Sequence, residues 1–431
     1  MRTIPSRDRL AHDPTDVRDL ADARSDFPSI GHHPDRAYLD SAATAQRPAQ
    51  VIDAERLFVE RDYAAVHRGA SEAVGAATEA FESARQKVAR FVGAGENEIV
   101  WTENATDAVN VVALGLSDAS TGVGDTILAL RPGDEILITE AEHHANLLPW
   151  QKLAARTGAV LRWAPVQADG TWTIDGLRAA ASDRTRLIAF AHVSNVTGYI
   201  APVADVVELA RSVGALTLLD ACQSVPHLPV DFGALGVDFA AFSGHKMLGP
   251  TGIGALYGRA ELLNALPPAR TGGSTITTVT MTEADFLPAP QRFEAGTQPV
   301  SQAVGLGAAV DYLDGWGMER IHAHETELAG LLTEAVAGIP DVTLIGPAPG
   351  TPRAAIVSVD VAGVHAHDVG QFLDARGISV RVGHHCAQPL HRAIGITAST
   401  RASAYLYTTA DEVARFGEAL AEVRGFFGAD R

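Results

Sequence analysis

The sequence predicts an α/β fold with a mainly parallel sheet, followed by a smaller α/β part toward the C-terminus. From residue 98 onward, short apolar runs alternate with helical stretches, which is the order of elements that builds a parallel sheet. Several of these runs end in a polar residue, and after residue 300 the alternation continues on a smaller scale. We expect an arm over residues 1–30, a large domain over 31–300 and a small domain over 301–431.

The N-terminal region is expected to contribute little to the main sheet. Residues 1–30 are rich in Arg, Asp and Pro, which favours a poorly ordered or surface arm with a short helix near residues 17–23. Over residues 38–43 we predict a short strand that runs into a turn of small residues, and the first residues of the large domain can join the small one. Helices are predicted over 49–62 and 71–92 from their periodicity.

The repeating pattern of the large domain locates its central strands and one insertion. A helix is expected over residues 108–116, and residues 117–131 are interpreted as an inserted loop whose role is open. Strands are predicted over residues 99–101, 135–139, 160–164, 187–192, 216–219 and 237–242.

The small domain shows a finer alternation of the same kinds of segment. Long helices are predicted over residues 302–315 and 319–337. Beyond them we expect strands over 342–345, 355–359 and 379–382, with helices over 367–376 and 411–427.

Composition limits the classes of function. With 431 residues and 46% hydrophobic content, the chain can bury a large core. Its net charge of −18 should repel nucleic acid and anionic membranes, so neither is an expected partner. Two cysteines cannot form a disulfide framework and fit a reducing cytoplasm, and the sequence shows no transmembrane-length apolar run and no signal peptide. We therefore expect a cytoplasmic protein.

Lys246 is the residue around which the candidate chemistry is organised. It follows an apolar run and His245, and it precedes a Gly-Pro turn. Desolvating an ammonium group is costly, so a lysine delivered there by a buried strand is seldom structural. Burial lowers the pKa of a lysine and frees an amine that can form a Schiff base with an aldehyde. The aldehyde we propose is pyridoxal phosphate; an ordinary loop lysine is the alternative.

Asp220 supplies the second half of that pattern. It ends another apolar strand, about one strand–loop–strand unit before Lys246. A pyridoxal enzyme needs an acid opposite the pyridine nitrogen, which keeps that nitrogen protonated as an electron sink. Taken singly, Asp220 and Lys246 could each be an ordinary surface residue. Their joint position at the ends of strands favours a cofactor site.

Other polar residues also follow predicted strands, where ligands of α/β proteins bind. Thr106 lies near a helix N-terminus and is either an anion ligand or a plain helix cap. His143 and His144 can be metal ligands, but we favour one ring stacked on a flat cofactor. Asn195 and Gln223 can both reach a phenolic oxygen.

Cys386 marks a second chemical centre in a turn rich in Gly and His. Neighbouring imidazoles can lower a thiol pKa and hold a reactive thiolate. The alternative is a buried cysteine without a chemical role, and Cys222 fits that description. Metal binding is a rival, since several potential ligands are close in sequence: His365, His367, His384, His385, Cys386 and His391.

Arg401 can clamp a substrate carboxylate through its planar guanidinium. A surface salt bridge is the alternative for this residue.

Taken together, these residues closely resemble the group II cysteine desulfurases, the SufS-like branch of the class V aminotransferases among fold-type I pyridoxal phosphate enzymes. The similarity runs from about residue 38 to about residue 427. It implies a mainly parallel seven-stranded sheet in the large domain and a catalytic cysteine loop in the small one. It rests on the motifs YLDSAAT, YAAVHRG, EHHANLLPW, HVSNVTG, LDACQSV, FSGHKMLGPTGIG, RFEAGT and RVGHHCA, of which LDACQSVPH and SGHKMLGP look actinobacterial.

The resemblance implies roles for the cofactor residues. Lys246 would form the Schiff base and later move the α-proton, Asp220 would pair with the pyridinium, and His143 would stack on the ring. Asn195 with Gln223 would hold the O3′ side of the ring. The phosphate would be bound by Thr106, Ser243 and His245, with Thr297 reaching in from the neighbouring subunit of a homodimer.

The resemblance also implies how substrate is handled. Cys386 would attack the sulfur of L-cysteine, leaving a persulfide and releasing L-alanine for iron–sulfur cluster assembly. Substrate would be bound by Arg401, Arg381 and Asn195, with His67 and Arg68 serving the partner's site.

Two features concern the sulfur acceptor and the phosphate. His367 matches a position that, in relatives using a zinc-containing SufU-type scaffold, can bind the partner's zinc. A SufU-like acceptor is therefore favoured over a SufE-like one, no resident metal is expected, and an ordinary helix-capping histidine is the alternative. Ala105 stands where many relatives have a hydroxyl residue, which removes one bond to the phosphate.

Alternative functions remain open at this stage. The same fold could act as a selenocysteine lyase or another C–S lyase, and a zinc-binding sulfur carrier without pyridoxal phosphate is a different class. The sequence does not distinguish cluster assembly from another sulfur pathway.

Overall fold

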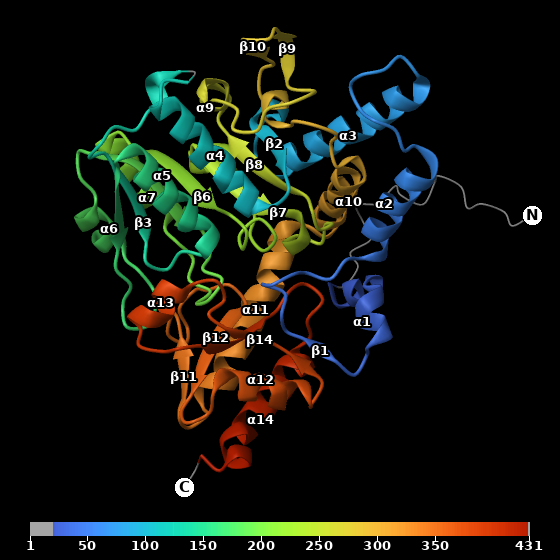
Figure 1. Cartoon of the computed structure of the whole chain (residues 1–431). Helices are drawn as coiled ribbons and strands as arrows, with labels where there is room; N and C mark the ends of the chain where they lie inside the picture. Colours follow the sequence, from blue (N-terminus) through green and yellow to red (C-terminus); the bar gives the residue numbers. More distant parts are fainter. Residues whose placement is uncertain (1–19, 124, 430–431) are drawn as a thin grey trace, which may run out of the picture.

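The computed structural model describes residues 20–123 and 125–429, and its largest element is a seven-stranded sheet (Figure 1). The strand order is β2-β8-β7-β6-β5-β3-β4. Strands β3 to β7 run parallel, whereas β8 is antiparallel to both of its neighbours. The expected α/β fold with a mainly parallel seven-stranded sheet is confirmed. Its strands are β2 (Ile99–Thr102), β3 (Glu135–Thr139), β4 (Val160–Ala164), β5 (Thr185–Ala191), β6 (Leu216–Asp220), β7 (Phe239–Ser243) and β8 (Gly254–Gly258).

Both faces of this sheet are covered, which explains why its central strands are apolar throughout. Successive side chains point to opposite faces, so Leu218 joins the core cluster under α4 and Leu219 joins the cluster under α7. One face carries α4 (Ala105–Ser120), α5 (Leu148–Thr157) and α9 (Ala260–Ala265). The other carries α3 (Glu72–Phe91), α6 (Ile174–Ala180), α7 (Val203–Val213), α8 (Phe232–Leu235) and α10 (Val300–Trp316), with α2 (Ala49–Arg61) packed on α10.

A smaller body lies below the large one, and α11 (Met318–Ala337) runs from the large body into it (Figure 1). Its antiparallel sheet has the order β11-β12-β15-β14. The strands are β11 (Val342–Ile345), β12 (Ile356–Val361), β14 (Arg381–Gly383) and β15 (Ser399–Ser403), and the remaining helices are α12 (Ala366–Asp374), α13 (Gln388–Ala393) and α14 (Ala410–Phe427).

The N-terminal region packs against this smaller body. Strand β1 (Ala37–Tyr38) pairs in parallel with β13 (Ile378–Ser379). Residues 20–26 form a 3₁₀ helix and α1 spans Pro28–His32. Phe27 is buried between Tyr312 and Tyr407, so of the two forms expected for the arm, residues 20–30 take the surface-packed one, with a 3₁₀ helix that overlaps the helix expected near residues 17–23. The rest of that arm lies outside the described residues.

One further expectation needs correction. Helix α4 begins at Ala105 and continues to Ser120, so residues 117–120 are helix rather than inserted loop. The short strand and turn expected over residues 38–43 are present, since β1 ends at Tyr38 and a turn begins at Ser41. A hairpin of β9 (Ile276–Val279) and β10 (Ala284–Phe286), which the sequence pattern did not indicate, projects from the large body (Figure 1).

Across the described part of the chain, none of the helices combines the length and the apolar character needed to cross a membrane.

Candidate active site

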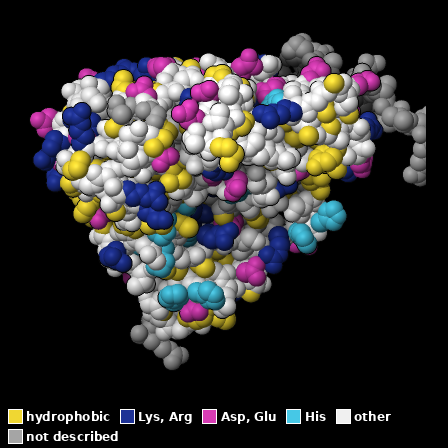
Figure 2. Space-filling view, turned by 45° about the horizontal axis from the view of Figure 1, so that its top comes forward, with side chains coloured by type: hydrophobic (Ala, Val, Ile, Leu, Met, Phe, Trp, Pro, Cys, Tyr) yellow, Lys and Arg dark blue, Asp and Glu magenta, His cyan; other side chains and the backbone are white. Residues whose placement is uncertain are grey.

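A cavity of about 590 Å³ lies where the carboxyl ends of β5, β6 and β7 meet the turn after β14. Ligands of open α/β sheets bind at this edge. Figure 2 shows a face that is hollowed near its centre, with basic and histidine side chains around the hollow. Most of the predicted site residues line the cavity: Thr106, His143, Asn195, Asp220, Gln223, Ser243, His245, Lys246, Arg381, Cys386 and Arg401.

Strand β7 delivers Lys246 to this cavity through one 3₁₀ turn, Gly244–Lys246. The turn is tight, since a Cβ at Gly249 would lie 2.9 Å from the carbonyl oxygen of Gly244. Lys246 is half-buried, and its Nζ has no hydrogen-bond partner among the described residues. A free amine directed into a cavity suits Schiff-base formation.

Asp220 ends β6 on the same wall of the cavity. Its side chain is 8% exposed and accepts a 3.0 Å hydrogen bond from the backbone N–H of Cys222. Burial, followed by the charge of Asp220, raises the pKa of Cys222 to about 12. Cys222 is therefore a buried neutral thiol, which matches the buried cysteine without a chemical role described from the sequence.

His143 faces Asp220, Lys246 and Arg401 across the cavity. Burial, opposed by Asp220 and aided by Lys246, lowers the pKa of His143 to about 4. Its Nδ1 accepts a hydrogen bond from the N–H of Ala145 at 3.0 Å, which places the proton of the neutral ring on Nε2. A neutral, oriented imidazole can stack on a flat ring.

Glu142, beside His143, is a site residue for which the sequence indicated no role. It is buried and accepts hydrogen bonds from Thr139 Oγ1 at 2.5 Å and Asn146 Nδ2 at 2.7 Å. Trp150 Nε1 in turn donates to Asn146 Oδ1 at 2.9 Å. This network fixes the turn that presents His143.

The N-terminus of α4 forms the opposite end of the cavity. Asn104 caps the helix by accepting from the N–H of Asp107, and Thr106 is exposed in the first turn. The N–H of Ala105 donates to Ser243 Oγ at 2.9 Å, so it orients that hydroxyl. Helix N-termini with free N–H groups attract anions.

His245 is held beside this helix end by Thr44, another residue that sequence reasoning missed. The Nδ1 of His245 lies 3.1 Å from Thr44 Oγ1. Burial, followed by the charge of Lys246, lowers the pKa of His245 to about 4. His245 is therefore a neutral hydrogen-bonding group at neutral pH.

Cys386 is exposed on a turn whose backbone is left-handed at two successive residues, His385 with φ +49° and Cys386 with φ +57°. Such a backbone costs on the order of 1 kcal/mol or more per residue unless the surroundings hold it. The carbonyl of His385 accepts from Asn195 Nδ2 and that of Cys386 accepts from the N–H of His144, both at 2.7 Å. The large body thus holds the thiol at the cavity wall.

The charge near Cys386 comes from Arg401 rather than from the neighbouring imidazole. Burial, followed by Arg401, lowers the pKa of His385 to about 2, and its Nε2 lies 2.9 Å from Ser399 Oγ. A neutral His385 cannot stabilise a thiolate by charge. The guanidinium of Arg401 is the cation that interacts electrostatically with Cys386.

Arg401 and Arg381 share one carboxylate, that of Asp40. Arg381 binds it with two hydrogen bonds of 2.6 and 3.3 Å, and Arg401 lies 3.5 Å from it. Arg401 is 3% exposed and also donates to the carbonyl of Asn195, while its Nε has no partner among the described residues. Asp40 therefore orients both arginines. The sequence feature that could have identified it is the acidic residue of the motif YLDSAAT.

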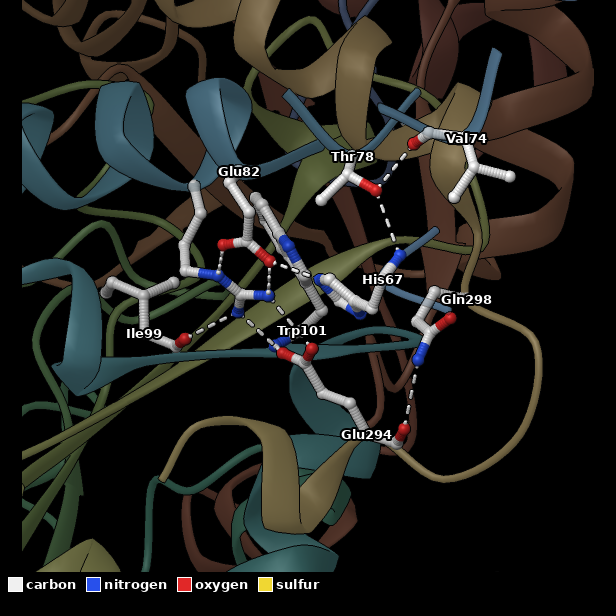
Figure 3. Close-up of polar contacts among 9 residues, drawn as sticks. His67, Val74, Thr78, Glu82, Ile99, Trp101, Glu294 and Gln298 are labelled. Atoms are coloured by element: carbon white, nitrogen blue, oxygen red, sulfur yellow. Dashed lines mark hydrogen bonds and ion pairs between the residues drawn. The ribbon is translucent and has the colours of Figure 1, made fainter. Parts of the chain in front are cut away.

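The structure does not bring Thr297, His67, Arg68 or His367 to this cavity. Thr297 lines a second cavity of about 610 Å³, which shares Glu103, Asn104 and Gly252 with the first. His67 binds Glu82, as Figure 3 shows, and Arg68 is exposed.

His367 lies exposed in the first turn of α12 and does not cap that helix. The cap is His365, whose Nδ1 accepts the N–H of His367 at 3.2 Å.

Within residues 20–123 and 125–429, no three His, Cys, Asp or Glu side chains are grouped in a way that would hold a metal ion.

The cavity fits pyridoxal phosphate in its donor set. It offers a carboxylate, a free amine, a neutral imidazole and a helix N-terminus around one space. The buried Gln223 Oε1 has no partner in the described part of the chain, while its Nε2 donates to the carbonyl of Ala42 and keeps a second N–H.

Fold and cavity together define the class V aminotransferase arrangement, and the sequence agrees. The pattern of the Aminotransferase class-V family matches residues 37–416, and the chain belongs to this family. Probable cysteine desulfurase 2 of Mycobacterium leprae is 51% identical over 422 residues, which cover 96% of this chain and 98% of that protein.

Two solved structures show the same fold. The apo cysteine desulfurase of Thermococcus onnurineus NA1 is 36% identical, with a TM-score of 0.88 over 95% of this chain and 99% of that one. A cystine C–S lyase in complex with its product cysteine persulfide is 25% identical, with a TM-score of 0.77 over 92% and 99% of the two chains.

Proposed function

We propose that this protein is a pyridoxal phosphate-dependent L-cysteine desulfurase that gives L-alanine and a persulfide on Cys386. The observation that carries the proposal is that Cys386, Lys246 and Asp220 line one cavity. The names and high identities of the relatives support the same activity. The cofactor is pyridoxal 5′-phosphate.

Some residues of the cavity are assigned to the cofactor and others to the substrate. Lys246 would hold the cofactor through its amine and move the α-proton, Asp220 would pair with the pyridine nitrogen, and the neutral ring of His143 would pack against the cofactor. Asn195 and Gln223 bind beside the ring oxygen. The phosphate is bound by Thr106, Ser243 and His245, and the substrate carboxylate by Arg401 with Arg381 and Asn195.

Cys386 performs the sulfur transfer. Its thiolate attacks the sulfur of L-cysteine, an S–S bond forms, and the carbon–sulfur bond breaks with its electron pair left on the substrate carbon. Bound pyridoxal phosphate would supply the electron sink for that electron pair. A proton then adds to the carbon, which gives alanine, and the transferred sulfur stays on Cys386 at the oxidation level of a persulfide.

The test compares Cys386→Ser with the wild type after a single addition of L-cysteine. Wild-type protein should gain one sulfur atom on the peptide containing Cys386 and release alanine. The serine variant should keep its visible pyridoxal absorbance but form neither product. Cys222→Ala serves as the control, because in this variant the sulfur taken from L-cysteine should still appear on Cys386. Full turnover of L-cysteine by the serine variant would contradict the proposal.

A C–S lyase or selenocysteine lyase of the same fold is the second candidate, and the similarity to the cystine lyase favours keeping it. Selenium leaves more readily than sulfur, so Cys386 would matter less for that reaction. Measuring the same serine variant on L-selenocysteine and L-cysteine separates the two functions.

The finer proposals concern assembly and acceptor. We propose a SufS-like, group II homodimer in the cytoplasm that supplies sulfur for iron–sulfur cluster assembly. Thr297, His67 and Arg68 then serve the partner subunit's site. The exposure of His367 supports a SufU-like zinc scaffold as acceptor.

The acceptor proposal is tested by sulfur transfer. His367→Ala should lose stimulation by a zinc-containing scaffold protein while its basal alanine formation stays intact. Equal stimulation of both proteins would contradict a role for His367, and sedimentation of the wild type as a monomer would contradict the dimer.

A further inference from the structure

A completely buried arginine lies in α3, outside the cavity described above. The side chain of Arg85 is 1% exposed, and each of its five N–H groups has an acceptor. Nε and Nη2 donate to the Glu82 carboxylate at 2.7 and 3.3 Å. Nη1 and Nη2 donate to the Glu294 carboxylate at 2.6 and 2.9 Å, and Nη1 also donates to the carbonyl of Ile99 at 2.9 Å.

Glu82 extends this ion-pair cluster to the loop over residues 63–69. Its Oε1 lies 2.7 Å from Nε2 of His67 (Figure 3). Burial favours a raised pKa for Glu82, but hydrogen bonds from His67 and Arg85 lower that pKa to about 2. The N–H of His67 also donates to Thr78 Oγ1 at 2.9 Å, and His67 has a left-handed φ of +67°. The cluster therefore stabilises the left-handed turn at His67, a conformation that a histidine does not favour by itself.

Glu294 extends the cluster in the other direction, to residues 293–298. It is 3% exposed and accepts a 2.8 Å hydrogen bond from the backbone N–H of Trp101 in β2. The amide of Gln298 closes the segment by donating to the carbonyl of Glu294 at 3.3 Å (Figure 3). Thr297 lies inside this closed segment, so its position depends on Glu294.

Stability alone is a weak reason for such a cluster. Removing an arginine and two carboxylates from water is costly, and apolar side chains of similar volume often give equal or greater stability. What the planar guanidinium adds is fixed geometry, because its two forks set the directions of both carboxylates at once. The cluster thus fixes two loops relative to α3 and β2.

Both loops border the second cavity, which Tyr63, Trp101, Glu294 and Thr297 help to line. That cavity adjoins the candidate active site at Asn104, the cap of α4. Thr297 therefore lies beside the candidate active site of its own chain but not in it, which is consistent with its proposed role in the partner subunit's site.

We propose that Arg85 is a positioning residue, which acts through Glu294 to hold Thr297 where its hydroxyl supports binding of the cofactor phosphate in the partner subunit of the homodimer. This inference rests on the proposed function, since it presumes a homodimer with pyridoxal phosphate at the α4 N-terminus of each subunit. It adds that cofactor affinity depends on a buried cluster that touches neither cofactor nor substrate.

The first test measures the Kd for pyridoxal phosphate of the full-length apoprotein by absorbance titration. Arg85→Lys keeps the charge but loses the fork, so we expect the Kd to rise at least about fivefold. Arg56→Lys is the matched control, because Arg56 also pairs with two carboxylates, Asp53 and Glu60, but on the exposed surface of α2. The control should leave the Kd unchanged.

The second test asks whether Arg85 acts through Thr297. Thr297→Ala should raise the Kd by a similar factor, and the Arg85→Lys/Thr297→Ala double variant should bind no more weakly than the weaker single variant. Effects that multiply in the double variant would overturn the proposed route.

A fallback is needed if Arg85→Lys does not fold. Glu294→Gln keeps the shape of the side chain and an acceptor for Trp101, and it should raise the Kd in the same way. An unchanged Kd in a folded Arg85 or Glu294 variant, with the wild type binding normally, would refute the positioning role. Failure of the wild type itself to bind pyridoxal phosphate would instead refute the proposed function.

Discussion

The backbone N–H of His144 donates a 2.7 Å hydrogen bond to the carbonyl oxygen of Cys386. This bond joins the turn that presents His143 to the turn that carries the thiol, although the two belong to different bodies of the molecule. The side chain of His144 adds a second link, because its Nε2 accepts the N–H of Gln388 at 3.2 Å. The cofactor side and the sulfur side of the site are thus held in one arrangement.

The first prediction concerns that side-chain link. His144→Ala removes the acceptor at the start of α13, at a cost of about 1 kcal/mol, so the turn at Cys386 should open more often. Alkylation of Cys386 by iodoacetamide should become several-fold faster, and persulfide formation from L-cysteine should slow. Peptide mass spectrometry measures both rates.

The control for His144 is His365→Ala. His365 accepts a backbone N–H at the same distance, 3.2 Å, at the start of another helix. It caps α12 rather than α13, so alkylation of Cys386 should be unchanged. If both variants speed alkylation equally, the link between His144 and the turn is not specific.

The second prediction concerns the buried acid beneath His143. Burial raises the pKa of Glu142 to about 8 from about 4.5, so the folded protein holds a proton that the unfolded chain releases between these values. The contribution of Glu142 to stability therefore falls as pH rises from about 5 to about 8. Glu142→Gln removes this loss, and its melting temperature relative to the wild type should increase with pH over that range.

Glu135→Gln is the matched control, with the opposite sign. Glu135 begins β3, the strand that leads to Glu142, and although burial favours a raised pKa for Glu135, hydrogen bonds from Ser182 and Arg184 lower that pKa. Wild-type stabilisation by Glu135 is then present near neutral pH and is lost in acid. If the difference in melting temperature between Glu142→Gln and the wild type did not change with pH, this result would contradict a protonated Glu142 in the folded protein.

The third prediction concerns substrate binding by Arg401. Arg401→Lys keeps a cation but loses the planar fork, and a charge-assisted hydrogen bond contributes about 1.5–3 kcal/mol. The KM for L-cysteine should rise roughly tenfold or more, with the cofactor absorbance preserved. Arg259→Lys, whose arginine lies outside the cavity, should leave KM unchanged. An unaltered KM in the Arg401 variant would rule out the carboxylate clamp.

The central strands β3, β5, β6 and β7 were predictable because they are largely buried on both faces and therefore appear as apolar runs. Strand β15 was not, since Ser399–Ser403 contains four polar residues and one alanine. It is fully buried only because its side chains find partners: Ser399 binds two histidines, Ser403 accepts from Ala42 and Arg401 pairs with Asp40. Those partners lie far away in the sequence, so no local pattern could indicate a strand.

The same contrast applies to the candidate site. Lys246, Asp220 and Cys386 stand out because their side chains are unusual at the ends of strands or in a glycine-rich turn. Thr44 and Arg85 act through residues that only the fold brings near, His245 and Glu294, whereas Glu142 acts through Thr139 and Asn146, which are close in sequence. Burial also changes a role read from the sequence: His385 lies next to Cys386, but its low pKa keeps it neutral.

The most direct measurement is the absorbance spectrum of the purified protein, reconstituted with pyridoxal phosphate, before and after L-cysteine. We expect a visible band of lysine-bound pyridoxal that is absent in Lys246→Ala. The band should shift on addition of L-cysteine, while alanine forms in parallel and sulfide appears once a reductant is added. A protein that shows no visible band after reconstitution, or a band without alanine formation, would contradict the proposed desulfurase.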